Sequence, residues 1–261
     1  MDLTETTKES GTGRHPWEVS RSHFVRQLLK QSGALSHEAD ESILDIGCGD
    51  SYVIEQILGA FPKAHAYACD SAFTPELIAI GEKRLGEKCR FFSSLEQAAG
   101  LITDGVNCVL LLDVLEHVEN DAGFLKQIAG YRFISPKTRF VITVPAFAGL
   151  FSSHDRFLKH CRRYSLNAVK SLAEKNGLRI VDKGYFYTSL LFPRIISVIL
   201  EKIFGSVEKS QKGIGGWKPK GFVDSLIVWL LDCDWKLCRI LNRVGIPLPG
   251  LSTYIVCEPS V

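Results

Sequence analysis

The chain has 261 residues, enough for one large domain or two small ones, and its 31 basic and 29 acidic side chains leave a formal net charge of +2. This weak charge argues against a nucleic-acid partner. The eight cysteines include no C-x-x-C pair, which argues against a disulfide framework or a zinc site and indicates reduced thiols in a cytoplasmic chain. Residues 1–14 are polar and contain no apolar signal segment, so we expect a mobile leader before a single domain at residues 15–261.

The segment that follows the leader begins an alternation of helices and strands. Residues 17–33 carry apolar side chains at helical spacing and end at Gly33, which predicts an amphipathic helix. Strands are then predicted near residues 42–46, 64–69, 89–92, 106–112 and 138–144, and helices near residues 51–60, 74–85, 94–100, 119–131 and 165–176. Because the strands are apolar throughout, we expect an α/β fold with a Rossmann-like, mostly parallel sheet that helices cover on both faces.

The last third of the chain departs from this alternation. Residues 177–188 and 251–258 are rich in β-branched and aromatic residues and are predicted to be closing strands. Between them, residues 188–245 form an insertion of two apolar helices around a glycine-rich loop. The loop carries Lys209, Lys212, Lys218 and Lys220. Neither helix has an uninterrupted apolar span of about 18 residues, so the insertion is either packed on the domain as core or lid, or in contact with a membrane surface.

The stretch SILDIGCGDS, from Ser42 to Ser51, joins the first strand to a glycine turn. In an open α/β sheet, ligands bind beyond the carboxyl ends of the strands, which is where this turn lies. Gly47 and Gly49 allow tight backbone conformations, and the next helix points its positive end at the same space. Asp70 ends the second strand, 21 positions after Gly49, where a carboxylate can accept both hydroxyls of a ribose. The pattern predicts a cofactor that contains adenosine.

Two residues of the turn distinguish between adenosine cofactors. Nicotinamide dinucleotides use a G-x-G-x-x-G turn, but Tyr52 occupies the third glycine position here and would obstruct a pyrophosphate. Asp45 would repel a pyrophosphate, yet it can receive the α-ammonium of an amino-acid cofactor, directly or through water. The residues therefore favour S-adenosylmethionine over a nicotinamide-dependent oxidoreductase, which is the alternative within the enzymes.

The chain resembles the class I S-adenosylmethionine-dependent methyltransferases, and most of all the small-molecule branch that includes the ubiquinone-pathway O-methyltransferases. The resemblance rests on LDIGCG at 44–49, ACD at 68–70, LLLDVLEHVEN at 110–120 and FVITVPAF at 140–147. It implies a seven-stranded sheet whose last strand, LSTYIVCE here, is inserted antiparallel. The expected cofactor is S-adenosylmethionine alone, with no metal.

The resemblance also implies how the cofactor is held. The expected cofactor-binding residues are Asp45, Gly47, Cys48, Gly49, Asp70, Ser71, Ser93, Asp113, Val114 and Leu115. Asp70 would hold the ribose, and Ser93 or Ser94 would lie near the adenine. Ser51 stands where many members have a third glycine, which leaves the fit of the methionine tail open. On the first helix, Trp17, Arg21 and His23 either close over the cofactor or pack on the sheet edge.

Methyl transfer from a sulfonium needs alignment, desolvation and removal of a proton from the acceptor. His117, just past the fourth strand, and His154, which Asp155 could orient, are the candidate catalytic bases, with a structural role as the alternative for each. The fourth strand lacks the Asn/Asp-Pro-Pro-Tyr/Phe pattern of many nucleic-acid and protein amine methyltransferases. An oxygen acceptor is therefore expected ahead of nitrogen or carbon.

A basic segment after the fifth strand, FSSHDRFLKHCRRYS, is expected on the rim of the same pocket. His160, Arg162, Arg163 and Tyr164 are the candidate substrate-binding residues, with the two arginines holding a carboxylate or phosphate. The alternatives are a solvated helix tied to the core by Tyr164 and salt bridges, and, more remotely, a metal bound by the histidines.

Together these features predict methyl transfer to a small or lipid-like acceptor that has an apolar and an acidic part. The rival from another class is a non-catalytic adenosyl-binding or membrane-surface scaffold. The expected location is cytoplasmic, and peripheral membrane contact through residues 188–245 is left open.

Overall fold

The computed structural model describes residues 14–205 and 221–260. The predicted leader, apart from Arg14, and the four lysines of the glycine-rich loop lie outside these ranges. The elements in chain order are α1 (Pro16–Gln31), β1 (Ser42–Ile46), α2 (Tyr52–Ala60), β2 (His65–Cys69), α3 (Pro75–Leu85), η1 (Gly86–Lys88), β3 (Cys89–Phe92), α4 (Leu95–Leu101), β4 (Cys108–Leu112), η2 (Leu115–His117), α5 (Asp121–Ala129), β5 (Arg139–Pro145), η3 (Ala148–Leu150), α6 (Ser153–Phe157), α7 (Leu166–Lys175), β6 (Leu178–Phe186), α8 (Thr188–Phe204), α9 (Phe222–Arg243) and β7 (Ser252–Pro259).

The strands form one seven-stranded sheet in the order β3-β2-β1-β4-β5-β7-β6. Strands β1 to β5 pair in parallel, whereas β7 runs antiparallel to both of its neighbours, β5 and β6. Every residue of β1 and β4 is buried, as expected of strands covered on both faces. The predicted Rossmann-like sheet with an antiparallel last strand is therefore confirmed.

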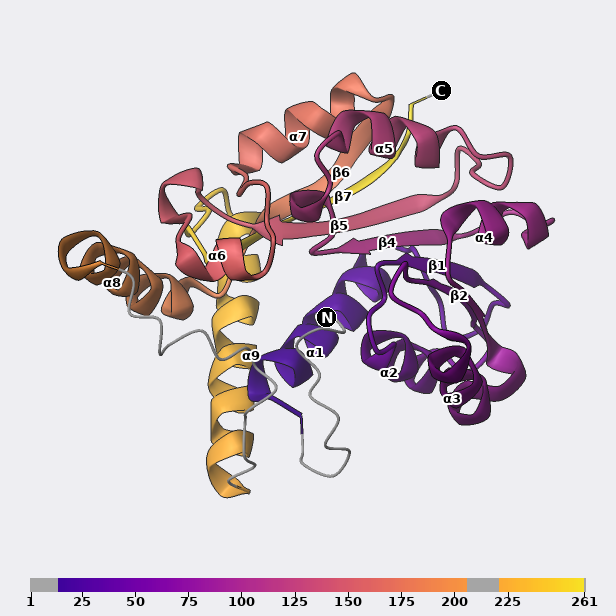
Figure 1. The fold of residues 1–261 in the computed structure, drawn as a ribbon, viewed down its shortest axis with the longest axis horizontal. Helices are drawn as coiled ribbons and strands as arrows, with labels where there is room; N and C mark the ends of the chain where they lie inside the picture. Colours follow the sequence, from indigo (N-terminus) through magenta and orange to yellow (C-terminus); the bar gives the residue numbers. More distant parts are fainter. Residues whose placement is uncertain (1–13, 206–220, 261) are drawn as a thin grey trace.

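Helices cover both faces of the sheet (Figure 1). Helices α1, α2, α3 and α9 lie on one face, where Phe24, Ile54 and Trp235 belong to one buried apolar cluster. Helices α4, α5 and α7 lie on the other face, where Leu125 and Val169 belong to a second cluster. This arrangement places every parallel strand between two apolar layers and leaves the carboxyl ends of the strands for a site.

The two insertion helices differ in how they attach to the domain. The second half of α9 packs on α1 and the sheet, where Phe24 stacks on Phe186 at 4.2 Å and meets Trp235 edge-on at 5.6 Å between ring centroids. Helix α8 lies at the outer end of the molecule (Figure 1), and only Leu191 and Val198 on it are buried. No helix in the described ranges is long and apolar enough to cross a membrane.

Both insertion helices present apolar side chains to the solvent. We call this the insertion face, and it consists of Phe192, Ile196, Ile199, Leu200, Ile203 and Phe204 on α8 and of Phe222, Val223, Leu226, Trp229 and Leu230 on α9. So large a set of exposed apolar side chains is unusual for a free surface and commonly marks contact with a partner or a membrane.

Candidate active site

A cavity of about 750 Å³ lies at the carboxyl ends of the parallel strands. Its lining includes the predicted site residues Gly47, Asp70, Ser71, Ser93, Asp113, Val114, His117, His154, His160 and Arg163, together with Ser94, Trp17 and Arg21. The predicted residues Asp45, Cys48, Gly49, Leu115, Arg162 and Tyr164 are not among the lining residues. Segments that lie far apart in the sequence therefore meet at one cavity, as the strand-end argument predicts.

The turn after β1 needs its glycines for different reasons. Gly47 has φ of +72°, and a Cβ at this position would come within 2.7 Å of a methyl group of Val114. Gly49, at φ of +58°, donates its N–H to a carboxylate oxygen of Asp70 at 2.8 Å. Ser51 adopts φ of +60° although it is not glycine, and Arg84 donates to its hydroxyl. The serine thus takes the left-handed conformation that glycine adopts without strain.

Asp70 is held at the end of β2 by two backbone donors. One carboxylate oxygen accepts the Gly49 N–H at 2.8 Å, and the other accepts the Ala72 N–H at 2.9 Å. Each carboxylate oxygen has a second lone pair, so Asp70 can still accept two further hydrogen bonds from a ligand in the cavity.

Asp45 lies beneath the turn and is only 2% exposed. Its Oδ1 atom has no hydrogen-bond partner, which is costly for a buried carboxylate. Burial raises the pKa of Asp45 to about 7, against the opposing effect of the Arg21 guanidinium and with a smaller contribution from Asp70. Near neutral pH this carboxyl group is therefore present in both its protonated and its ionised form.

Helix α1 reaches the site through Trp17 and Arg21. The guanidinium of Arg21 lies 5.0 Å from the Trp17 ring centroid and forms an ion pair with Asp113 at 2.8 Å. Asp113, at φ of +57°, also accepts the hydroxyl of Thr143 at 2.9 Å. His23 instead pairs with Asp232 of α9 at 2.7 Å and lies outside the cavity, so only two of the three predicted α1 residues reach the site.

Asp155 is the centre of the polar contacts around α6. It is fully buried and forms ion pairs with Arg163 at 2.7 Å and with Arg194 at 2.5 Å, and it contacts Nδ1 of His160 at 3.1 Å. Burial alone would raise the pKa of Asp155, but the hydrogen bond with His160 and the two guanidinium groups hold it well below its usual value. The sequence predicts Asp155 as the partner of His154, whereas the structure pairs it with His160.

His154 lines the cavity, but Asp155 forms its hydrogen bond with His160 and not with His154. Burial and the nearby Arg194 guanidinium lower the pKa of His154, because both disfavour the charged imidazolium. The ring is therefore neutral at physiological pH and can accept a proton.

Two of the predicted substrate-binding residues, Arg162 and Tyr164, contact neighbouring parts of the protein. Arg162 pairs with Asp121 at 2.8 Å and donates to the Glu119 carbonyl at 2.7 Å. The Tyr164 hydroxyl donates to Asp121 at 2.7 Å and lies 3.1 Å from the Leu115 carbonyl. Burial raises the pKa of Tyr164, so the phenol stays protonated. Arg162 and Tyr164 are not among the lining residues of the cavity, and their contacts favour the alternative role, which is to tie this segment to the core.

Glu116 and Arg194 are two charged lining residues that the prediction missed. Glu116 is fully buried, and neither carboxylate oxygen has a hydrogen-bond partner. Burial and the Asp113 carboxylate raise its pKa well above the usual value. Arg194 comes from α8 and donates to the Ser152 hydroxyl at 2.7 Å as well as to Asp155. The sequence did contain a signal for each residue: Glu116 is a charged residue within the apolar run LLLDVLEHV, and Arg194 is a single arginine within an apolar helix.

Comparisons with known proteins agree with this architecture. The model of the methyltransferase domain family matches residues 18–183. The malonyl-[acyl-carrier protein] O-methyltransferase of Bacillus cereus is 39% identical over 67 residues, which are 26% of this chain and 23% of that protein. The match thus spans less than a quarter of that relative's length.

Solved structures share the fold at low sequence identity. A putative sarcosine dimethylglycine methyltransferase from Galdieria sulphuraria is 13% identical with a TM-score of 0.58, covering 93% of this chain and 86% of that one. The plantazolicin methyltransferase BamL, solved with a triazolic desmethylPZN analogue and SAH, is 15% identical with a TM-score of 0.54. The alignment covers 92% of this chain and 85% of that one.

The family match extends over more than half of the chain and includes the glycine turn, Asp70 and the segment after β4. The match to a methyltransferase family favours S-adenosylmethionine over a nicotinamide dinucleotide, so the expected cofactor is confirmed. The chain belongs to the methyltransferase domain family and is a class I S-adenosylmethionine-dependent methyltransferase.

Proposed function

We propose that this enzyme transfers the methyl group of S-adenosylmethionine to an oxygen atom of a small acceptor that carries an acidic group and an apolar part. The observation that carries the proposal is the composition of one cavity. Its lining contains the Asp70 carboxylate, the guanidinium groups of Arg163 and Arg194, and His154, whose lowered pKa leaves the imidazole neutral and able to accept a proton. The proposal also includes that this enzyme is related to the ubiquinone-pathway O-methyltransferases within the small-molecule branch.

The cofactor half of the site is proposed residue by residue. Asp70 accepts the ribose hydroxyls, Gly47 leaves room for the methionine part, and Ser93 or Ser94 contacts the adenine. Asp45 interacts with the α-ammonium through water, because it is buried beneath the turn and not on the cavity surface. The cofactor supplies an activated methyl group on a sulfonium, so the protein has only to align and deprotonate the acceptor.

Cofactor affinity is expected to increase about tenfold from pH 6 to pH 8. The pKa of Asp45 is about 7, and only the ionised carboxylate attracts an ammonium group. Calorimetric titration with S-adenosylmethionine at pH 6, 7 and 8 measures this change. The Asp45→Asn variant should bind more weakly and show little pH dependence; an undiminished pH dependence in that variant would rule out Asp45 as its source.

Stability of the free protein should depend on pH with the opposite sign. Because the folded-state pKa of Asp45 is raised, the folded state holds a proton that the unfolded chain releases between about pH 4 and pH 7. The contribution of this residue to stability is complete below pH 4 and decreases as the pH rises to about 7. Urea unfolding of wild type and Asp45→Asn over this range provides an independent check on the residue.

The charges around the cavity favour an acidic acceptor. Two guanidinium groups that line one part of the cavity, those of Arg163 and Arg194, share a single carboxylate, Asp155, which leaves one positive charge in excess within this group of three side chains. An anionic group on the acceptor would offset this charge. The Bacillus cereus relative is named for methylating an oxygen of a malonyl group, which is itself acidic, and this supports the same acceptor class.

The apolar part of the acceptor is inferred from the cavity lining and the insertion face. Val118, Phe124 and Leu158 line the cavity, and Arg194 connects it to α8. The opposite side of α8 carries Ile203, which is 66% exposed. Four lysines lie in the sequence between α8 and α9, which suits an anionic lipid surface. We therefore include peripheral membrane contact through residues 188–245 and a lipid-like acceptor in the proposal.

His154 is the proposed base. The acceptor oxygen loses its proton to the neutral imidazole and bonds to the methyl carbon, while the carbon–sulfur bond breaks and its electron pair stays on sulfur. The sulfonium becomes a neutral thioether, and the imidazolium returns the proton to the solvent. Such a base contributes roughly 10²-fold or more to the rate.

The test is a methyl-transfer assay with matched acceptors in anionic phospholipid vesicles. The acceptors are a long-chain alkyl hydroxybenzoic acid, the corresponding aminobenzoic acid, and the short-chain form of each. We expect methylation of the oxygen acceptor with the long chain, and about 10²-fold slower turnover in His154→Ala with unchanged cofactor affinity. His37→Ala is the matched control, because this histidine is exposed and lies outside the cavity.

Four outcomes of this assay would each contradict a different part of the proposal. Methylation of the amine would overturn the acceptor atom, and methylation of short-chain acceptors alone would overturn the lipid-like class. Turnover of His154→Ala equal to that of wild type would remove the base. Cofactor binding without transfer to any acceptor would favour the scaffold alternative.

A further inference from the structure

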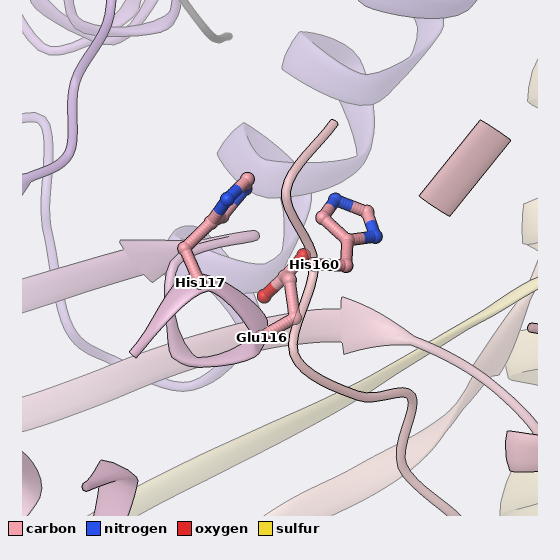
Figure 2. A group of neighbouring side chains, drawn as sticks. All are labelled: Glu116, His117 and His160. Carbon is pink, nitrogen blue, oxygen red and sulfur yellow. The ribbon is translucent and has the colours of Figure 1, made fainter. Parts of the chain in front are cut away.

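Three side chains with metal-binding atoms meet at the cavity. Glu116 and His117 lie in the 3-10 turn η2 directly after β4, and His160 lies in the loop after α6. One ligand atom from each lies within 4.8 Å of the others. Figure 2 shows the three side chains projecting into the same space, with the Glu116 carboxylate beside the two imidazole rings, whose centroids lie 4.7 Å apart. All three residues line the cavity.

The Glu116 carboxylate has no role in the protein's own hydrogen bonding. It is fully buried, and both oxygens are without a hydrogen-bond partner. Native proteins rarely leave a buried carboxylate in this condition, because the desolvation cost is several kcal/mol. A carboxyl group in this state that also lines a cavity points to a bound species that is positively charged or donates hydrogen bonds.

The donor set and its surroundings favour a divalent transition metal. Two imidazoles and one carboxylate with open positions are typical of catalytic zinc and non-haem iron sites. Around such an ion the ligand atoms stand roughly 3–4 Å apart, given bonds of about 2.1 Å, so small side-chain rotations would close the cluster. Asp155 contacts Nδ1 of His160 at 3.1 Å, which leaves Nε2 for a metal. A carboxylate that orients a ligating histidine in this way is a common feature of metal sites.

We propose that Glu116, His117 and His160 bind a divalent transition-metal ion whose open positions face the cavity and take an oxygen of the acceptor. This inference rests on the proposed function for the identity of the acceptor, and it adds to it a means of activating that oxygen. A cation lowers the pKa of a bound hydroxyl, so the proton passes to His154 more readily before the oxygen attacks the methyl carbon. The cofactor itself needs no metal, and the ion would act on the acceptor alone.

The test uses Co²⁺ as a probe, with the untagged, metal-free protein. Visible absorption and calorimetry report the coordination and the affinity of the ion. We expect one Co²⁺ per chain with a structured visible band, and at least about tenfold weaker binding in Glu116→Gln and in His160→Gln. His154→Gln is the matched control, since it removes a cavity histidine outside the cluster and should leave Co²⁺ affinity unchanged.

The same samples are titrated with S-adenosylmethionine, which separates this inference from the proposed function. Absence of Co²⁺ binding to the wild type, or Co²⁺ affinity in both ligand variants equal to that of the wild type, overturns the metal site even if the cofactor binds normally. Loss of Co²⁺ in both variants with intact cofactor binding supports the site, also where the acceptor assay fails. Circular dichroism and the cofactor titration together show that each variant has folded.

Discussion

Replacement of Asp70 by alanine is expected to weaken S-adenosylmethionine binding by at least about 100-fold. In the proposed complex the carboxylate accepts two ribose hydroxyls, and hydrogen bonds to a charged group contribute roughly 1.5–3 kcal/mol each. The substitution also removes the acceptor of the Gly49 and Ala72 N–H groups, so the glycine turn loses its support at the end of β2. Calorimetric titration of wild type and variant measures the loss directly.

Two further variants make this result interpretable. Asp104→Ala removes an exposed carboxylate in the loop before β4 and should leave cofactor affinity unchanged. Asp70→Asn keeps one oxygen to support the turn but loses the charge and one acceptor, so we expect an intermediate affinity. If Asp70→Ala folds and binds the cofactor as wild type does, the ribose-binding role of Asp70 is wrong.

The fold could be predicted because its signals are local in the sequence. Apolar runs buried on both faces of a parallel sheet mark β1, β4 and β5 without reference to any other segment. The glycine turn and Asp70 follow from the same logic, since strand ends in such a sheet meet at one edge. The antiparallel insertion of β7 rested on the resemblance to a family, because the residues of a single strand do not determine its neighbours.

The candidate site was predicted less well where the chain is irregular. Between α6 and α7 the backbone has no repeating pattern, so the direction of each side chain depends on distant contacts. Arg163 points to Asp155 in the site, whereas its neighbour Arg162 points to Asp121. Arg194, about 40 residues away in the sequence, completes the contacts of Asp155. No periodicity links these segments, and the pairing of Asp155 with His160 could not be read from spacing.

These contacts also join the insertion to the candidate site, because Arg194 of α8 lines the cavity. Helix α8 is fixed at its inner side by Arg194, which binds Asp155, and by Glu201, which accepts the Ser153 N–H at 2.8 Å and pairs with Arg156 at 3.2 Å. Its outer side belongs to the insertion face. A membrane or partner that binds the insertion face would therefore contact the same helix that contributes Arg194 to the cavity. One helix could thus serve both as a lid and as a membrane contact, the two roles that the sequence left open.

Replacement of Asp155 by alanine should have the largest effect on stability, about 3–5 kcal/mol. The carboxylate is fully buried between Arg163 and Arg194, and its removal leaves two guanidinium groups without their shared anion. It also removes the acceptor for the Ser152 N–H at the start of α6. Urea unfolding at pH 7 measures the loss, and hydrogen exchange of α8 should increase because Arg194 no longer holds the helix.

The pH dependence of this effect distinguishes a charge interaction from simple packing. The folded-state pKa of Asp155 is lowered, so its contribution to stability is present above about pH 4 and is lost as the pH falls below that value. The stability difference between wild type and Asp155→Ala should therefore shrink in acid. Glu201→Ala, which removes a partly exposed carboxylate from the same network, should cost about 1 kcal/mol or less. A loss below 1 kcal/mol for Asp155→Ala at pH 7 would mean that the two arginines find other anions, and that α6 and α8 are not joined through this carboxylate.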